Sequence, residues 1–136
     1  MDGNRMAQGS DSEKITINLG FVDLGQVDLL VEDGFYSNRT DFIRTAIRNQ
    51  LLTHGDVLKT SVARRSMVLG LQRYTRQDLE KVVKAGEQLQ IHVLGLATID
   101  DDVSPQLARK AIASIAVLGA LRASSEVKAA LADRTR

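Results

Sequence analysis

The sequence predicts an α/β (α+β) protein made of two unlike parts, and three observations support this prediction. The segment "KITINL", residues 14–19, alternates polar and apolar side chains, which is typical of a half-buried strand. Two segments with apolar residues at helical spacing follow it before residue 54. Further on, the phrase Val-Leu-Gly occurs three times, and each copy precedes a helical segment. The first two observations predict a strand-helix-helix unit, and the third predicts a second unit of repeated strand-helix pairs.

These patterns divide the chain into four segments. Residues 1–12 are small, polar and without period, so we expect a disordered N-terminal arm. Residues 13–56 hold the strand-helix-helix unit, and residues 57–66 form a linker or a helical extension. Residues 67–136 hold the strand-helix repeats, which we expect to serve in oligomerisation.

Composition limits the possible functions. The 136 residues carry a formal net charge of +1, and residues 57–136 hold thirteen basic and eight acidic side chains. Any contact with nucleic acid is therefore local rather than spread over the chain. The absence of cysteine excludes disulfides and thiolate metal sites. No apolar run approaches the roughly 18 residues of a membrane span, so we expect a cytoplasmic protein with no membrane partner.

The strand predicted at residues 14–19 has two unlike faces. Its polar face carries Lys14, Thr16 and Asn18, and its apolar face carries Ile15, Ile17 and Leu19. A single strand is unstable because its edges present unpaired backbone groups. The simplest partner is the same strand from a second copy, paired antiparallel about a two-fold axis. The polar side chains of both copies then line one exposed ribbon, whose width suits the major groove of B-DNA.

Two helices complete the first unit. The first places Leu24, Val27, Leu30 and Val31 at helical spacing and ends at Gly34, a residue suited to the left-handed position after a helix. The second begins at the N-cap Asn38, with Asp41 as its capping partner, and ends near His54. Its apolar stripe contains Phe42, Ile43, Ala46, Ile47 and Leu51.

The segments "KITINL", "GQVDLLVEDG" and "GFYSNRTDFIRTAIRNQL" closely resemble the ribbon-helix-helix transcription factors of the CopG/Arc/MetJ type. The resemblance covers residues 13–55. It implies an intertwined, obligate homodimer on double-stranded DNA, in which Lys14, Thr16 and Asn18 read the bases.

The start of the second helix is the expected phosphate site. The first N–H groups of a helix lack internal partners and carry the positive end of its dipole, so they hold an anion. Four residues are expected to contact the DNA backbone there, namely Ser37, Asn38, Arg39 and Thr40. The expected dimer core consists of Ile15, Ile17, Leu19, Val27, Leu30, Val31, Phe42, Ile43, Ala46 and Ile47.

The second unit repeats with a period of 24–25 residues. Val-Leu-Gly occurs at residues 68–70, 93–95 and 117–119, followed by helical segments at 75–88, 104–112 and 124–134. Thr75, Ser104 and Ser124 occupy N-cap positions, and Pro105 suits a first helical position. These units predict a parallel three-stranded array with helices on one side, its glycines allowing close packing. A βαββαβ regulatory fold is the alternative.

The sequence contains few residues suited to bind a cofactor or a metal or to act in catalysis. A transition-metal site needs several His or Cys ligands, and the chain offers only His54 and His92, which we interpret as structural. The acidic run at residues 100–102 is interpreted as a solvated loop rather than a cation site. No nucleophile is paired with a base, so we expect no catalytic residue, no metal and no cofactor.

The favoured function is a sequence-specific, DNA-binding transcriptional regulator, acting as a repressor and associated with the nucleoid. Residues 67–136 are expected to assemble its dimers into tetramers or larger bodies. Two alternatives remain open: an antitoxin whose C-terminal part binds a toxin, and an accessory factor that organises DNA.

Overall fold

The computed structural model describes residues 11–136, so most of the predicted N-terminal arm, residues 1–12, lies outside the described residues. The chain divides into two compact units, residues 1–58 and 59–136. The first unit contains α2 (Phe21–Glu32) and α3 (Arg39–Thr53). A further helix, α4 (Gly55–Arg64), follows α3 after His54, so most of the predicted linker or extension at residues 57–66 is helical.

The turn between α2 and α3 is built as the sequence predicts. Gly34 adopts a positive φ of 86°, where a side chain would be strained. The Gly34 N–H donates to Val31 O at 3.1 Å and the Phe35 N–H donates to Leu30 O at 3.0 Å. These two bonds are those of a Schellman motif, which satisfies the last carbonyls of α2 and ends the helix.

Six residues, 33–38, separate α2 from α3. The Asn38 side chain accepts from the Asp41 N–H at 2.8 Å, as predicted for the N-cap. Asp41 departs from the prediction in one detail: its carboxylate accepts from the N–H of Ser37 at 2.9 Å rather than from that of Asn38. Both bonds fix the start of α3 relative to the turn.

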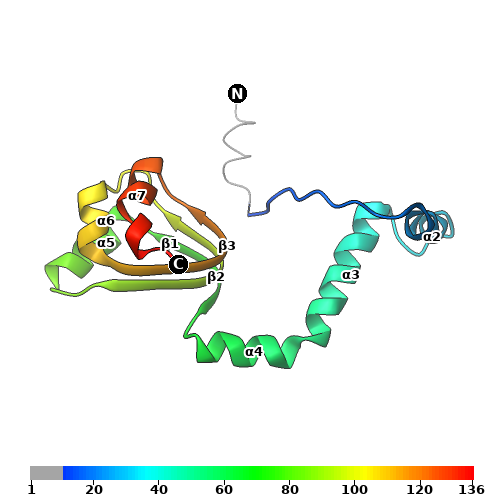
Figure 1. The fold of residues 1–136 in the computed structure, drawn as a ribbon, viewed down its shortest axis with the longest axis horizontal. Helices are drawn as coiled ribbons and strands as arrows, with labels where there is room; N and C mark the ends of the chain where they lie inside the picture. The colour runs from blue at the N-terminus through cyan, green and yellow to red at the C-terminus, as the bar shows by residue number, and fades with distance from the viewer. Residues whose placement is uncertain (1–10) are drawn as a thin grey trace. The chain divides into compact units, whose positions relative to one another are not determined.

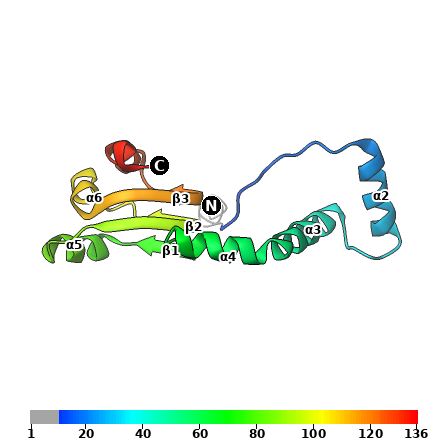
Figure 2. The ribbon, with the colours of Figure 1, turned by 60° about the horizontal axis from the view of Figure 1, so that its bottom comes forward.

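The second unit is a three-stranded sheet with the order β1-β2-β3 and all strands parallel. Its strands are β1 (Val68–Tyr74), β2 (Leu89–Ile99) and β3 (Ile112–Arg122). Figures 1 and 2 show the three strands side by side. The three Val-Leu-Gly phrases lie in register across the sheet, with Gly70 opposite Gly95 and Gly95 opposite Gly119. The parallel order is incompatible with the alternative βαββαβ fold, which is therefore wrong.

A helix follows each strand. These are α5 (Arg76–Lys84), α6 (Pro105–Ala111) and α7 (Ser125–Ala130), the last followed by a short 3₁₀ helix, η1 (Ala132–Arg134). Each helix is shorter than the segment predicted for it. The three predicted N-caps are confirmed, because Thr75, Ser104 and Ser124 each accept from the N–H three residues later. Only Thr75 forms a full capping box, with Asp78.

The glycines of the strands mark bends. Gly70, Gly95 and Gly119 have φ values of 130°, 141° and 117°, which the L side chains of other residues rarely adopt. A Cβ on Gly95 would lie 2.2 Å from Gly70 O, and a Cβ on Gly119 would lie 2.0 Å from Gly95 O. Each strand therefore curves at its glycine, and the next strand packs closely against it there. This confirms the close packing expected of the repeated glycines.

The core of the second unit lies between the sheet and its helices. It draws on β2, β3 and all three helices, which therefore pack on the same side of the sheet, as predicted. Its buried members are Leu79, Ile91, Val93, Ala97, Ile99, Val103, Ala108, Ala111, Ile112, Ile115, Val127 and Leu131.

Candidate nucleic-acid interface

The segment expected to read bases forms neither strand nor helix in the single chain. Residues 14–19 form no strand among the described residues, and Lys14, Thr16 and Asn18 are exposed. A ladder of hydrogen bonds needs a second strand, and the prediction drew that strand from another copy of the chain. The ribbon and its base-reading face therefore stay a prediction.

The start of α3 offers free backbone donors. Asn38 caps the Asp41 N–H, and the Asn38 carbonyl accepts from the Phe42 N–H at 3.2 Å. Within the described part of the chain, the N–H groups of Arg39 and Thr40 have no acceptor. These donors belong to the first turn of the helix, where the dipole favours an anion. The geometry suits a phosphate at the place where the sequence predicted one.

Arg39 has a partner that the sequence pattern did not reveal. Its guanidinium forms a two-pronged pair with Asp28 of α2, with Nε–Oδ1 and Nη2–Oδ2 distances of 2.8 Å. The hydrogen bonds from Arg39 hold the pKa of Asp28 below its usual value of 3.8, and the bonds to Asp28 raise the pKa of Arg39. A guanidinium carries five N–H donors, so the pair leaves three for another acceptor.

The pair acts as a brace between the two helices. Asp28 and Arg39 are eleven residues apart, a separation at which no helical or strand periodicity marks a contact. The only available sequence signal was the acidic residue itself on a helix next to a basic helix start. Arg39 was therefore predictable as a candidate from the sequence, whereas Asp28, the residue that holds it, was not.

The predicted dimer core is largely open in the single chain. Val27 is buried, and the side chains of Leu30, Val31, Phe42 and Ile43 are half-buried. Ala46 and Ile47 are exposed, so their predicted burial is not met within one chain.

The apolar face of the predicted strand is also open. Ile15 and Ile17 expose 69% and 56% of their surface, and Leu19 exposes 41%. Further exposed apolar side chains in this unit are Phe21, Val22, Leu29, Phe35, Leu51, Leu52, Val57 and Leu58. Apolar surface on this scale marks an interaction site.

The remaining candidate residues have structural partners. His54 closes α3, and its ring Nε2 lies 3.3 Å from Gln50 Nε2. His92 in β2 is half-buried, with its ring Nε2 3.3 Å from Ser114 Oγ. Asp100 of the acidic run is paired with Arg73, at two distances of 2.8 Å.

The described residues contain neither a metal-ligand cluster nor a helix suited to a membrane. Residues 11–136 contain no group of three or more His, Cys, Asp or Glu side chains placed to hold a metal ion. None of the helices described is long and apolar enough to cross a membrane.

Comparison with known protein families identifies a match. The model of a family described as the Ribbon-Helix-Helix transcriptional regulator family matches residues 10–128. No curated protein and no solved structure matches significantly. The match extends far beyond residue 55, so it includes α2, α3 and all three strands of the second unit.

Proposed function

The chain belongs to the Ribbon-Helix-Helix transcriptional regulator family, and from this premise we propose that it is a repressor that reads the major groove of its operator. Membership confirms the resemblance drawn from residues 13–55. In the proposal, residues 13–56 form the DNA-binding and dimerisation domain. The strands of two copies pair as an antiparallel ribbon, with Lys14, Thr16 and Asn18 directed at base edges.

The observation that carries the proposal is the start of α3. The N–H groups of Arg39 and Thr40 have no acceptor within the described part of the chain, and the Arg39 side chain is held by Asp28. We assign the DNA phosphate to this place, with contacts from Ser37, Asn38, Arg39 and Thr40. Such contacts set the register of the protein on DNA, while the ribbon sets the sequence.

The open apolar surface supports a dimer as the working form. Burial of an exposed isoleucine or leucine contributes roughly 1.5–3 kcal/mol. Burying the apolar face of the ribbon in both copies would therefore contribute substantially to dimerisation. Residues 67–136 are proposed to assemble the dimers into tetramers or larger bodies. Two dimers then bind two half-sites with the advantage of effective concentration.

The packed second unit favours the regulator over the antitoxin alternative. An antitoxin of this type covers its toxin with a tail that orders on binding, whereas residues 67–136 already bury a core of their own. The accessory-factor alternative shares the same DNA contacts and differs only in its effect on transcription. An operator fused to a reporter gene separates it from a repressor.

Selection of bound sites from random duplexes, followed by two substitutions, tests the proposal. Thr16→Ala and Asn18→Ala are expected to narrow the affinity difference between the selected site and random DNA by about 1–3 kcal/mol each, because base contacts are lost. Thr53→Ala, at the far end of α3, serves as the control. Unchanged discrimination in both ribbon variants, with the dimer intact, would mean that the ribbon does not read DNA.

A further inference from the structure

We propose that the second unit joins copies of the chain head to tail, with the outer edge of β3 in one copy paired in parallel with the outer edge of β1 in the next. This deepens the assembly role proposed above by naming the surfaces and their register. The partner is a second copy of this chain. The interface is heterologous, so two different edges of the same unit meet.

Both edges are available in the described part of the chain. The outer edge of β1 has no strand partner from Val68 to Tyr74. The first part of the outer edge of β3 is covered: Ile115 is bridged by Thr135 and accepts from the Arg136 N–H, and the Ile112 carbonyl accepts from the Arg134 side chain. The part of β3 left open starts near Val117. In the sheet, Val117 is level with Val93, and Val93 is level with Val68, where β1 begins. The edge of β3 from Val117 to Leu121 is thus level with the edge of β1 from Val68 to Gln72.

The glycine geometry gives the interface a direction. A Cβ built on Gly95 would point at the Gly70 carbonyl of the preceding strand, and one built on Gly119 would point at the Gly95 carbonyl. Nothing lies within 4 Å of the Cβ position of Gly70. A β3 strand of another copy, placed beside β1 in the same register, would bring its Gly119 carbonyl to that open position. An antiparallel pairing of β1 with β1 does not reproduce this packing.

Exposed leucines follow the same register. Leu69, Leu94 and Leu118 lie in a row across the sheet. The central Leu94 is half-buried between its neighbours, whereas Leu69 and Leu118 at the two edges expose 71% and 51% of their surface. Head-to-tail pairing places Leu118 of one copy beside Leu69 of the next. Each outer leucine then gains the flanking neighbour that it lacks in the single chain.

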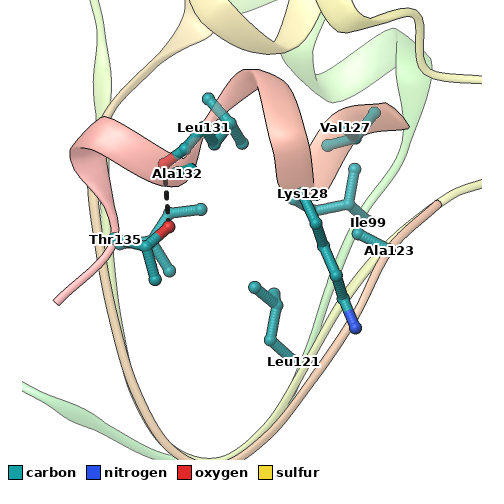
Figure 3. Close-up of a pocket in the computed structure, with 9 residues that line it drawn as sticks. Ile99, Leu121, Ala123, Val127, Lys128, Leu131, Ala132 and Thr135 are labelled. Atoms are coloured by element: carbon teal, nitrogen blue, oxygen red, sulfur yellow. Dashed lines mark hydrogen bonds between the residues drawn. The ribbon is translucent and has the colours of Figure 1, made fainter. Parts of the chain in front are cut away.

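A hollow marks the β3 end of the unit. A cavity of about 360 Å³ opens between α7 and the end of β3, lined mainly by apolar side chains. Figure 3 shows Leu121 and Lys128 beside this space, with Leu131 above it. Its lining comes chiefly from the last repeat, so a further strand and helix beside β3 and α7 would cover it. The β1 and α5 elements of the next copy supply such a pair.

Introduced cysteines test the register directly, since the chain has no cysteine of its own. Paired residues on neighbouring strands have Cα atoms about 5 Å apart, within the range that a disulfide spans. Leu69→Cys and Leu118→Cys variants of the full chain are oxidised mildly, each alone and mixed in equal amounts. Glu87→Cys, in the exposed loop after α5, replaces Leu69→Cys as the control.

Head-to-tail pairing predicts that disulfide-linked chains form in the Leu69→Cys and Leu118→Cys mixture, several-fold more than in either variant alone. The control mixture of Glu87→Cys with Leu118→Cys stays at background. Stronger linkage of Leu69→Cys with itself would show that β1 pairs with β1 and would overturn the proposal. Background linkage in every sample would overturn it as well.

Sizing and DNA binding separate this inference from the proposed function. Leu69→Asp is expected to reduce larger assemblies to dimers while each dimer still binds a single half-site. If Leu69→Asp leaves the mass of the assemblies unchanged, the edges of β1 and β3 do not join copies, whatever the DNA result. If the assemblies link through cysteines but no variant binds DNA, the regulator proposal fails and the head-to-tail contact stands.

Discussion

Arg39 illustrates how one side chain serves both fold and function. Its two-pronged bond to Asp28 ties α3 to α2 and leaves three guanidinium donors that can meet a phosphate. A guanidinium fixed before binding loses less conformational freedom when it meets an anion. The carboxylate of Asp28 acts as a positioning group in this arrangement.

Arg39→Ala is expected to weaken binding to all duplexes alike, since a phosphate contact carries no base information. The slope of log affinity against log salt should fall by about 0.9, the value for one phosphate contact. Arg48→Ala is the matched control, because Arg48 is exposed on the same helix but lies away from its first turn. A loss confined to the operator, with an unchanged salt slope, would contradict the phosphate role.

The same pair makes a prediction about pH. The pKa of Asp28 is lowered by its hydrogen bonds to Arg39, so the paired carboxylate stabilises the fold above the ordinary pKa of 3.8. That contribution is lost as pH falls through the lowered value, and it is small because the pair is exposed to solvent. In an NMR titration of the side-chain carboxyls, Arg39→Ala should raise the pKa of Asp28. An unchanged value would show that the bond does not persist in solution.

At the scale of elements, substitutions at the strand glycines can distinguish backbone strain from a steric clash with the neighbouring strand. Gly70 and Gly119 both have positive φ, so a side chain at either position strains the backbone by roughly 1–3 kcal/mol. Only Gly119 also faces a backbone carbonyl, 2.0 Å from its Cβ position. Gly119→Ala should therefore lower the free energy of unfolding by a further 1–3 kcal/mol or so, the usual cost of overpacking.

Urea unfolding of the full chain, followed by a probe in the second unit, measures this difference. Both variants are compared in the Leu69→Asp background, where contacts between copies do not contribute. Equal losses for Gly70→Ala and Gly119→Ala would mean that the strands do not approach each other at the glycines.

The repeat shows what a sequence alone can predict. Three copies of Val-Leu-Gly predicted three strands, and the caps Thr75, Ser104 and Ser124 predicted where the helices begin. Both signals are local, since each depends on residues a few positions apart. The same holds for Gly34 and Asn38, which predicted the turn between α2 and α3.

Features that depend on distant residues were not predictable. The bend at each glycine reflects the curvature of the whole sheet, which no single repeat specifies. The bonds from Arg39 to Asp28 and from Arg73 to Asp100 join residues 11 and 27 positions apart. The pairing of the strand expected at residues 14–19 is harder still to predict from local patterns, because its partner is expected in another copy of the chain.

At the scale of the whole molecule, the two units differ in how they are stabilised. The second unit buries a core of apolar side chains from its sheet and helices. In the described part of the first unit, Val27 is the only apolar side chain that is buried. Because this unit has so little internal packing, we expect its folding and its dimerisation to be one event.

Hydrogen exchange on the full chain tests this dependence. The amides of α2 and α3 are expected to gain protection as protein concentration rises, whereas those of the central strand β2 stay protected throughout. Leu19→Asp places a charge on the apolar face of the predicted ribbon and should remove the protection of α2 and α3 while leaving β2 unaffected. Asn49→Asp introduces the same charge at an exposed polar position of α3 and should have little effect. Protection of α2 and α3 that is independent of concentration and survives Leu19→Asp would mean that the first unit folds alone. The two-stranded reading surface would then lose its physical basis.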